Sequence, residues 1–168
     1  MIEKMMAVAL GAALLLIPAP ARADFDFSTP KPPAAADRVI EVVNKMPKRW
    51  QVKQAVTWLD RYTASRMKLV KRCSGRAYDC ITIRPGKVRQ AAVGWSNGRG
   101  TITVDTGKAK RYAKYYGKAG NRKWLVVHEL GHEAFGLEHR AGRNVMNPAV
   151  NKAAMKWTSG QRAHLRKR

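Results

Sequence analysis

HELGHEAFGLEH, residues 128–139, contains three of the four histidines of the chain and begins with the pattern H-E-x-x-H. If the stretch is helical, His128 and His132 lie one turn apart on the same face, so two imidazoles can bind one metal ion while Glu129 projects beside them. A pattern this short also matches ordinary helices by chance, so the neighbouring residues on its C-terminal side decide its meaning.

A glycine and a methionine stand at informative positions after the motif. Gly136 can end a helix by adopting a left-handed conformation, and a chain that turns back there can carry His139 to the same metal ion. Beyond His139, the sequence Asn144-Val145-Met146-Asn147-Pro148 forms a tight polar turn around one apolar methionine.

Together these features resemble the metzincin clan of zinc endopeptidases, whose pattern is H-E-x-x-H-x-x-G-x-x-H followed by a Met-turn beneath the metal. Pro148, two residues after Met146, makes the likeness closest to small secreted matrixin-like peptidases. The resemblance implies a Zn²⁺ cofactor and a zincin-like fold. It also implies metal ligation by His128, His132 and His139.

The resemblance has one defect, because three residues rather than two separate His132 from Gly136. Counted from His132, the third ligand falls on Glu138; counted from Gly136, it falls on His139. We expect His139, because a neutral imidazole suits zinc and the glycine offset is preserved, with Glu138 as the alternative. The extra residue rotates the third ligand about the helix axis by ~100° and advances it by ~1.5 Å, so a π-bulge or a tightened last turn is expected.

Residues 140–168 contain no Asp or Glu, which argues against the H-E-x-x-H enzymes that take a glutamate ligand from a later helix. His164 is the only other downstream candidate ligand, and we expect it to face solvent in a basic terminal helix.

Three neutral imidazoles would leave the zinc ion its double charge and an open position for water, whose pKa falls to about 7. Glu129 is placed to accept a proton from that water and pass it to the leaving amine. The sequence therefore predicts a zinc-dependent endopeptidase that hydrolyses protein or peptide substrates, and gives no support to a serine or cysteine nucleophile.

The N-terminus predicts secretion. Lys4 precedes an apolar run at residues 5–17, and an A-x-A pattern ends at Ala23, so residues 1–23 are expected to be a signal peptide. The run is shorter than the ~20 residues that span a bilayer, so we expect no stable membrane anchor. Cys73 and Cys80 are then expected to form a disulfide.

The remaining chain suggests a Pro/Ala-rich leader at residues 24–37 and one zinc metallopeptidase domain at residues 38–168. We expect an α+β, zincin-like single domain: a mixed twisted sheet with a backing helix, an active-site helix, a Met-turn and a C-terminal helix. Asn121 could cap the active-site helix, and residues 158–161 form a capping box for the last one. The backing helix is expected at residues 48–65, and strands at residues 67–72, 80–84, 91–95 and 101–105. Residues 91–97 are expected either to pair with extended substrate or to form an ordinary sheet edge.

Charge is the second unusual feature, since 33 Lys and Arg against 11 Asp and Glu give a formal net charge of +22. The densest basic and aromatic stretch spans residues 108–118. Such a field favours anionic surfaces such as a cell-wall polymer; nucleic acid is possible but not favoured. The alternative function is a secreted cationic surface- or nucleic-acid-binding protein with a vestigial or structural zinc site. Glu129 favours the enzyme, because a structural site needs no general base. We expect a monomer.

Overall fold

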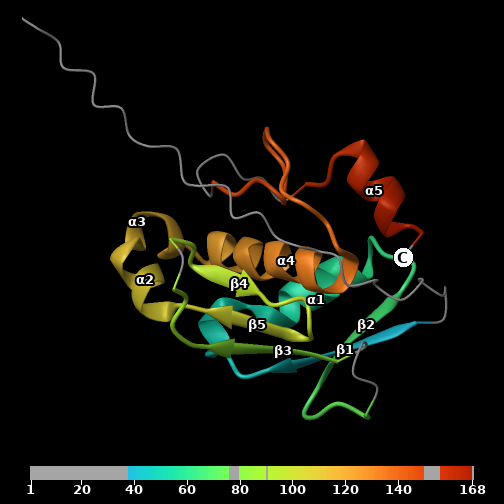
Figure 1. Cartoon of the computed structure of the whole chain (residues 1–168), viewed down its shortest axis with the longest axis horizontal. Coiled ribbons are helices and arrows are strands. Elements are labelled where there is room, and N and C mark those ends of the chain that lie inside the picture. The colour runs from blue at the N-terminus through green and yellow to red at the C-terminus, as the bar shows by residue number, and fades with distance from the viewer. Residues whose placement is uncertain (1–37, 76–79, 90, 150–155, 168) are drawn as a thin grey trace, which may run out of the picture.

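A five-stranded mixed sheet forms one layer of the molecule (Figure 1). The computed structural model describes residues 38–75, 80–89, 91–149 and 156–167. The strands are β1 (Val39–Asn44), β2 (Arg66–Val70), β3 (Cys80–Pro85), β4 (Gly94–Ser96) and β5 (Thr101–Val104), in the spatial order β2-β1-β3-β5-β4. β4 runs antiparallel to β5 and all other neighbours are parallel. β4 is therefore an edge strand of this sheet.

The sheet is apolar on one face because alternate strand residues point the same way. Register places Val42 beside Ile81 and Ile83 beside Ile102, and all four side chains are buried. The opposite face carries polar side chains such as that of Glu41. One face thus supplies the surface on which helices can pack.

Two helices, α1 (Val52–Asp60) and α4 (Ala119–Phe135), pack against each other and against the sheet (Figure 1). The buried residues of α1 are Val52, Ala55, Val56 and Leu59, the spacing of one helix face. The shorter helices are η1 (Lys48–Trp50), α2 (Thr106–Arg111), α3 (Ala113–Tyr116) and α5 (Ser159–Leu165). In α5 the expected capping box is present, since Thr158 and Gln161 exchange side-chain to backbone hydrogen bonds.

The α+β architecture expected from the sequence is confirmed, and its details differ in four places. The prediction that Asn121 caps α4 is wrong: α4 begins at Ala119, and the Asn121 amide donates to the carbonyl of Tyr115 at 2.7 Å. The predicted helix over residues 48–65 is a 3-10 turn followed by the shorter α1. β4 begins at Gly94 rather than at residue 91. β1 was not predicted, because Glu41 interrupts an otherwise apolar run.

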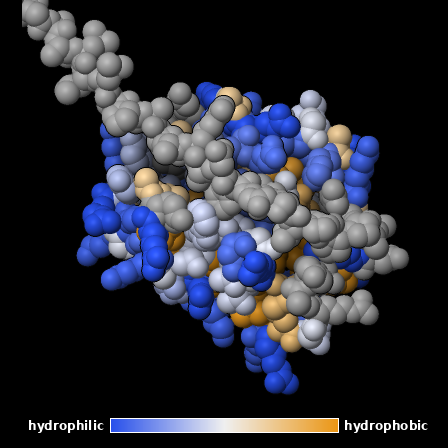
Figure 2. Space-filling model, viewed as in Figure 1, coloured by the Kyte–Doolittle hydropathy of each residue, from blue (hydrophilic) through white to orange (hydrophobic). Residues whose placement is uncertain are grey.

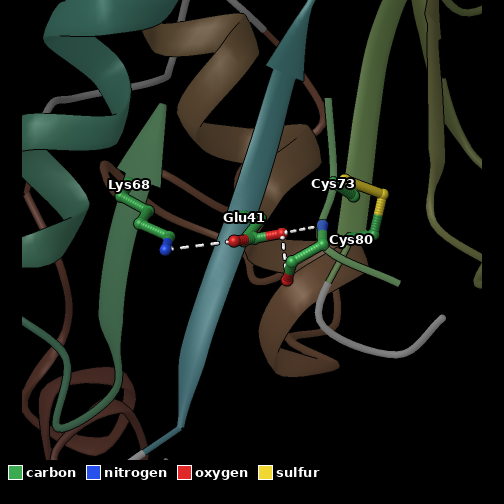
Figure 3. The surroundings of a disulfide bond; sticks show 5 residues. Glu41, Lys68, Cys73 and Cys80 are labelled. Carbon is green, nitrogen blue, oxygen red and sulfur yellow. Dashed lines mark hydrogen bonds and ion pairs between the residues drawn. A yellow bond between two sulfur atoms is a disulfide. The ribbon is translucent and has the colours of Figure 1, made fainter. Parts of the chain in front are cut away.

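A disulfide joins Cys73 to Cys80, as expected (Figure 3). Beside it, the Glu41 carboxylate of β1 accepts hydrogen bonds from the backbone N–H of Ser74 at 2.6 Å and from its hydroxyl at 2.9 Å. Lys68 of β2 lies 3.0 Å from the other carboxylate oxygen. We call this group, Glu41, Lys68, Ser74 and the disulfide, the disulfide corner.

The predicted signal peptide (residues 1–23) and leader (residues 24–37) lie outside the described residues. Among the helices of the described part of the chain, none has the length and apolar character needed to cross a bilayer.

Candidate metal centre

α4 places the first two histidines of the motif on one face, as their spacing predicts. The Nε2 atoms of His128 and His132 lie 3.1 Å apart, and their rings meet edge to face. His128 is buried and His132 is partly buried. One turn of helix thus aims two imidazole nitrogens at the same point.

The chain then reverses at Gly136, whose φ of 63° lies in the left-handed region. One common helix ending closes with a backbone bond that spans four residues, donated by the left-handed residue. Here Gly136 N–H donates to His132 at 3.0 Å and also to Gly131, and Leu137 N–H donates to Gly131 at 3.1 Å, so the two bonds to Gly131 span five and six residues. The one-residue insertion is therefore accommodated by a widened, π-type last turn, in agreement with the expected π-bulge and not with the alternative of a tightened turn.

The widened turn brings His139 to the histidine pair, with its Nε2 atom 3.2 Å from Nε2 of His128. In the described residues, His128, His132 and His139 form a group whose ligand atoms all lie within 4.8 Å of one another. Glu138 and His139 are both exposed, but only His139 is a member of this group. The structure therefore brings together the three histidines that were expected from the sequence.

Hydrogen bonds on the far side of two rings fix which nitrogen carries the proton. Nδ1 of His128 donates to the carbonyl of Val145 at 2.8 Å, and Nδ1 of His132 donates to that of Leu137 at 2.5 Å. A carbonyl can only accept, so in the neutral rings the Nε2 atoms carry lone pairs. Lone pairs that face each other at 3.1 Å repel, and a cation between them removes this repulsion.

The pKa values of His128 and His139 favour the neutral form. Burial, with the neighbouring His132 as a second cause, holds the pKa of His128 well below its ordinary value, and burial also lowers the pKa of His139. Two ligands bound to zinc at 2.0–2.1 Å with tetrahedral angles lie about 3.3–3.4 Å apart. The observed separations of 3.1 and 3.2 Å are close to this spacing, so the residues present fit a zinc ion.

Met146, in the turn that follows His139, is fully buried. A Cβ atom on Gly131 of α4 would lie 2.8 Å from the Met146 sulfur, so the glycine is what allows this close approach. Asn144, also buried, holds the turn from within: its side chain accepts from Met146 N–H at 2.9 Å and donates to the carbonyl of Ala141 at 2.9 Å. The Met-turn is thereby packed directly against the metal-site helix.

Glu129 points toward β4, where Gly94 leaves room for its carboxyl group: a Cβ atom on Gly94 would lie 2.7 Å from the Glu129 carboxyl carbon. Burial, followed by the nearby Glu133 carboxylate, raises the pKa of Glu129 to about 8. Burial raises the pKa of the Tyr116 phenol to about 12, with the Glu129 charge as a second cause. The carboxyl group therefore lies in a desolvated site at the edge of the sheet.

Sequence reasoning missed Glu133, a buried residue that closes the β4–β5 turn. Its carboxylate accepts hydrogen bonds from the hydroxyl of Ser96 and from the backbone N–H groups of Gly98, at 2.9 Å, and Gly100, at 2.5 Å. The sequence offered one signal for this role: a charged residue directly after His132, in a helix whose neighbouring residues are buried.

His164 does not join the metal group. It is partly buried, and its Nε2 donates to the carbonyl of Phe135 at 3.0 Å, so the expectation that it faces solvent is wrong. Its hydrogen bond links α5 to the end of α4.

No protein-family model and no curated protein matches the chain. Comparison with solved structures finds a similar fold in a zinc-dependent peptidase from Methanocorpusculum labreanum (strain Z), with a TM-score of 0.52. The two are 11% identical, and the match covers 75% of this chain and 99% of that one. At this identity the likeness concerns the fold, which is one that can carry a zinc-dependent peptidase site.

Proposed function

We propose that the chain is a secreted zinc-dependent endopeptidase of the matrixin-like metzincin type. The observation that carries this proposal is the convergence of three histidine Nε2 atoms, with the Glu129 carboxyl one residue along the helix from the first of them. A purely structural site would need the histidines but not a buried carboxyl group beside them.

In this proposal His128, His132 and His139 hold the metal, and the carbonyls of Val145 and Leu137 keep the first two rings correctly oriented. When bound, zinc supplies an acidified water and polarises the scissile carbonyl. The charge of a bound zinc ion would favour the ionised form of Glu129, which would then accept the proton of the attacking water and transfer it to the leaving amine.

We further propose that extended substrate pairs with β4. This strand is at the edge of the sheet, and the Glu129 carboxyl packs against its first residue, Gly94. Main-chain pairing at such an edge would place a scissile bond close to both the carboxyl group and the histidines. The loop expected to shape the side-chain pocket, near residues 146–156, falls partly outside the described residues.

Secretion is part of the proposal and rests on residues 1–23, the expected signal peptide, and on the Cys73–Cys80 disulfide. Removal of residues 1–37 would leave the domain at residues 38–168 to carry the activity.

The test of the proposed activity is Glu129→Gln. We expect this variant to retain zinc, because the ligands are unchanged, and to lose peptide hydrolysis by a factor of about 10² or more, because the proton acceptor is lost. Zinc content is measured by elemental analysis. Hydrolysis is measured with casein, with and without a chelator. Glu138→Gln, which removes the same charge at an exposed site, should behave like the wild type. Full activity of Glu129→Gln would exclude this carboxyl group from the reaction.

The ligand assignment has its own test. His139→Ala should weaken zinc affinity by a factor of about 10² or more, while Glu138→Ala should change it little, since Glu138 lies outside the histidine group. Zinc affinity is measured by competition with a chromogenic chelator. The reverse order of effects would assign the third position to Glu138.

The second candidate is a secreted cationic binding protein whose zinc site is vestigial or structural. The observation in its favour is charge, since of the described acidic residues only Asp60 and Glu138 are exposed. Hydrophilic side chains also gather on the coloured part of the face in Figure 2. Casein that stays intact with zinc-loaded protein, together with salt-sensitive binding to an anionic polymer, would favour this candidate over the peptidase.

A further inference from the structure

A cavity of about 280 Å³ opens between the loop after α1 and helix α5, and three arginines line it. Arg61 follows the last residue of α1, whereas Arg162 and Arg166 come from α5 and the residue after it. The remaining lining residues are Tyr62, Thr63 and Ala64. None of these residues belongs to the histidine site, so the cavity is a separate feature of the surface.

The base of the cavity is held in place by hydrogen bonds. Ala64 N–H donates to the carbonyl of Leu165 at 3.1 Å, which ties the loop to the end of α5. The guanidinium of Arg162 donates to the carbonyl of Trp157 at 3.1 Å, and the Thr63 hydroxyl donates to the carbonyl of Ser65 at 2.6 Å. Two segments far apart in sequence thus form a fixed rim around the cavity.

The positive charge of this rim exceeds what its surroundings can neutralise. Two helices, α1 and α5, end at the cavity, and each helix C-terminus is equivalent to about −0.5 charge. Asp60, which directly precedes Arg61, adds one negative charge, so the three guanidinium groups leave an excess of about one positive charge. Among the described residues no carboxylate forms an ion pair with these arginines, and the neighbouring Asp60 instead accepts a hydrogen bond from Met67 N–H at 2.7 Å.

We propose that this arginine cavity binds a phosphate group, either as inorganic phosphate or as a small phosphate monoester. Such a group carries about −1.5 to −2 charges at neutral pH, so the net positive rim attracts it. Guanidinium groups bind phosphate oxygens through paired N–H donors, and three arginines line this cavity. The volume also leaves room for a small group attached to the phosphate.

The test is calorimetric titration of the zinc-loaded protein with inorganic phosphate, and separately with glycerol phosphate, at constant ionic strength. Arg61→Gln and Arg166→Gln are compared with Arg111→Gln, which removes the same charge at the end of α2, away from the cavity. We expect one saturable site in the wild type, an affinity at least tenfold lower in the two cavity variants, and a change below twofold in Arg111→Gln. Tighter binding of glycerol phosphate than of inorganic phosphate would identify a monoester as the occupant.

Three outcomes would overturn the proposal. Equal losses in all three variants, or no saturable binding, would mean that the arginines serve only the helix ends and the general positive field. Binding that both cavity variants retain and that His132→Ala abolishes would place phosphate at the metal centre instead. Circular dichroism of each variant confirms that it remains folded.

Discussion

Two buried glutamates, Glu41 and Glu133, each fasten a turn of the chain by accepting backbone N–H groups, yet their surroundings differ. At the disulfide corner, Glu41 holds Ser74, and both Lys68 and the Cys73–Cys80 bridge reinforce the same corner (Figure 3). There the turn is held by a hydrogen-bonded carboxylate, an ion pair and a covalent bond.

Glu133 holds the β4–β5 turn, which contains no cysteine, through the N–H groups of Gly98 and Gly100 and the hydroxyl of Ser96. Its carboxylate is also close enough to Glu129 to raise the pKa of that group. The comparison indicates that a loss at the disulfide corner affects stability alone. A loss at Glu133 should affect both stability and the site.

Glu133→Ala should have the largest effect. The buried hydroxyl of Ser96 left unpaired costs roughly 1–3 kcal/mol, and the loss of two hydrogen bonds from the more exposed N–H groups of Gly98 and Gly100 adds to this, so we expect a loss of about 3 kcal/mol in total. Because β4 flanks Glu129, peptide hydrolysis should fall as well, even at temperatures where the variant is folded. Stability is measured by urea unfolding and hydrolysis by initial rates.

Glu138→Ala is the matched control, because it removes the same charge from an exposed position and leaves the β4–β5 turn intact. If Glu133→Ala lost stability but kept wild-type hydrolysis when folded, the two glutamates would be equivalent and the comparison would fail.

The second prediction sharpens the comparison within α4. Gly131→Ala places a methyl group 2.8 Å from the Met146 sulfur and should destabilise the fold by about 1–3 kcal/mol while weakening zinc affinity. Gly120→Ala, in the first turn of the same helix, meets nothing within 4 Å and should be neutral or stabilise by up to about 1 kcal/mol. Thermal unfolding with and without zinc measures both. Similar behaviour of the two variants would show that Met146 moves aside freely and does not define the site.

Sequence patterns predicted the elements with strong local signals. The H-E-x-x-H spacing, the left-handed Gly136 and the Thr158 capping box depend on residues a few positions apart, and each takes the expected form. The alternation of apolar residues predicted the α+β class. The expected secretion of the protein predicted the disulfide between Cys73 and Cys80.

Features that depend on tertiary contacts were not predictable in the same way. β1 was missed because its Glu41 is buried by partners on β2 and by Ser74, which no local pattern reveals. The role of Glu133 depends on a turn more than 30 residues earlier in the chain. The widened turn at Gly136 absorbs an insertion for which sequence counting left two alternatives, a π-bulge or a tightened turn.

The smallest expected effect is at the disulfide corner, where Glu41→Gln should change the pH dependence of stability. Hydrogen bonding from the Ser74 N–H, with Lys68 as a further cause, holds the pKa of Glu41 below its ordinary value. A carboxyl group with a lowered pKa in the folded state stabilises the fold fully above its unfolded pKa, and this contribution is lost as pH falls through the folded pKa.

The wild type should therefore exceed Glu41→Gln in melting temperature by a constant amount from pH 7 to about pH 5, and the difference should shrink below about pH 4. The difference should stay small throughout, because the Cys73–Cys80 bridge holds the same corner in both proteins. Differential scanning calorimetry across this pH range measures it, and zinc affinity at pH 7 should be unchanged. A difference in melting temperature that is independent of pH would mean that the carboxylate charge of Glu41 contributes nothing to stability. A large fall in zinc affinity would show that the disulfide corner and the metal centre are coupled, contrary to the comparison.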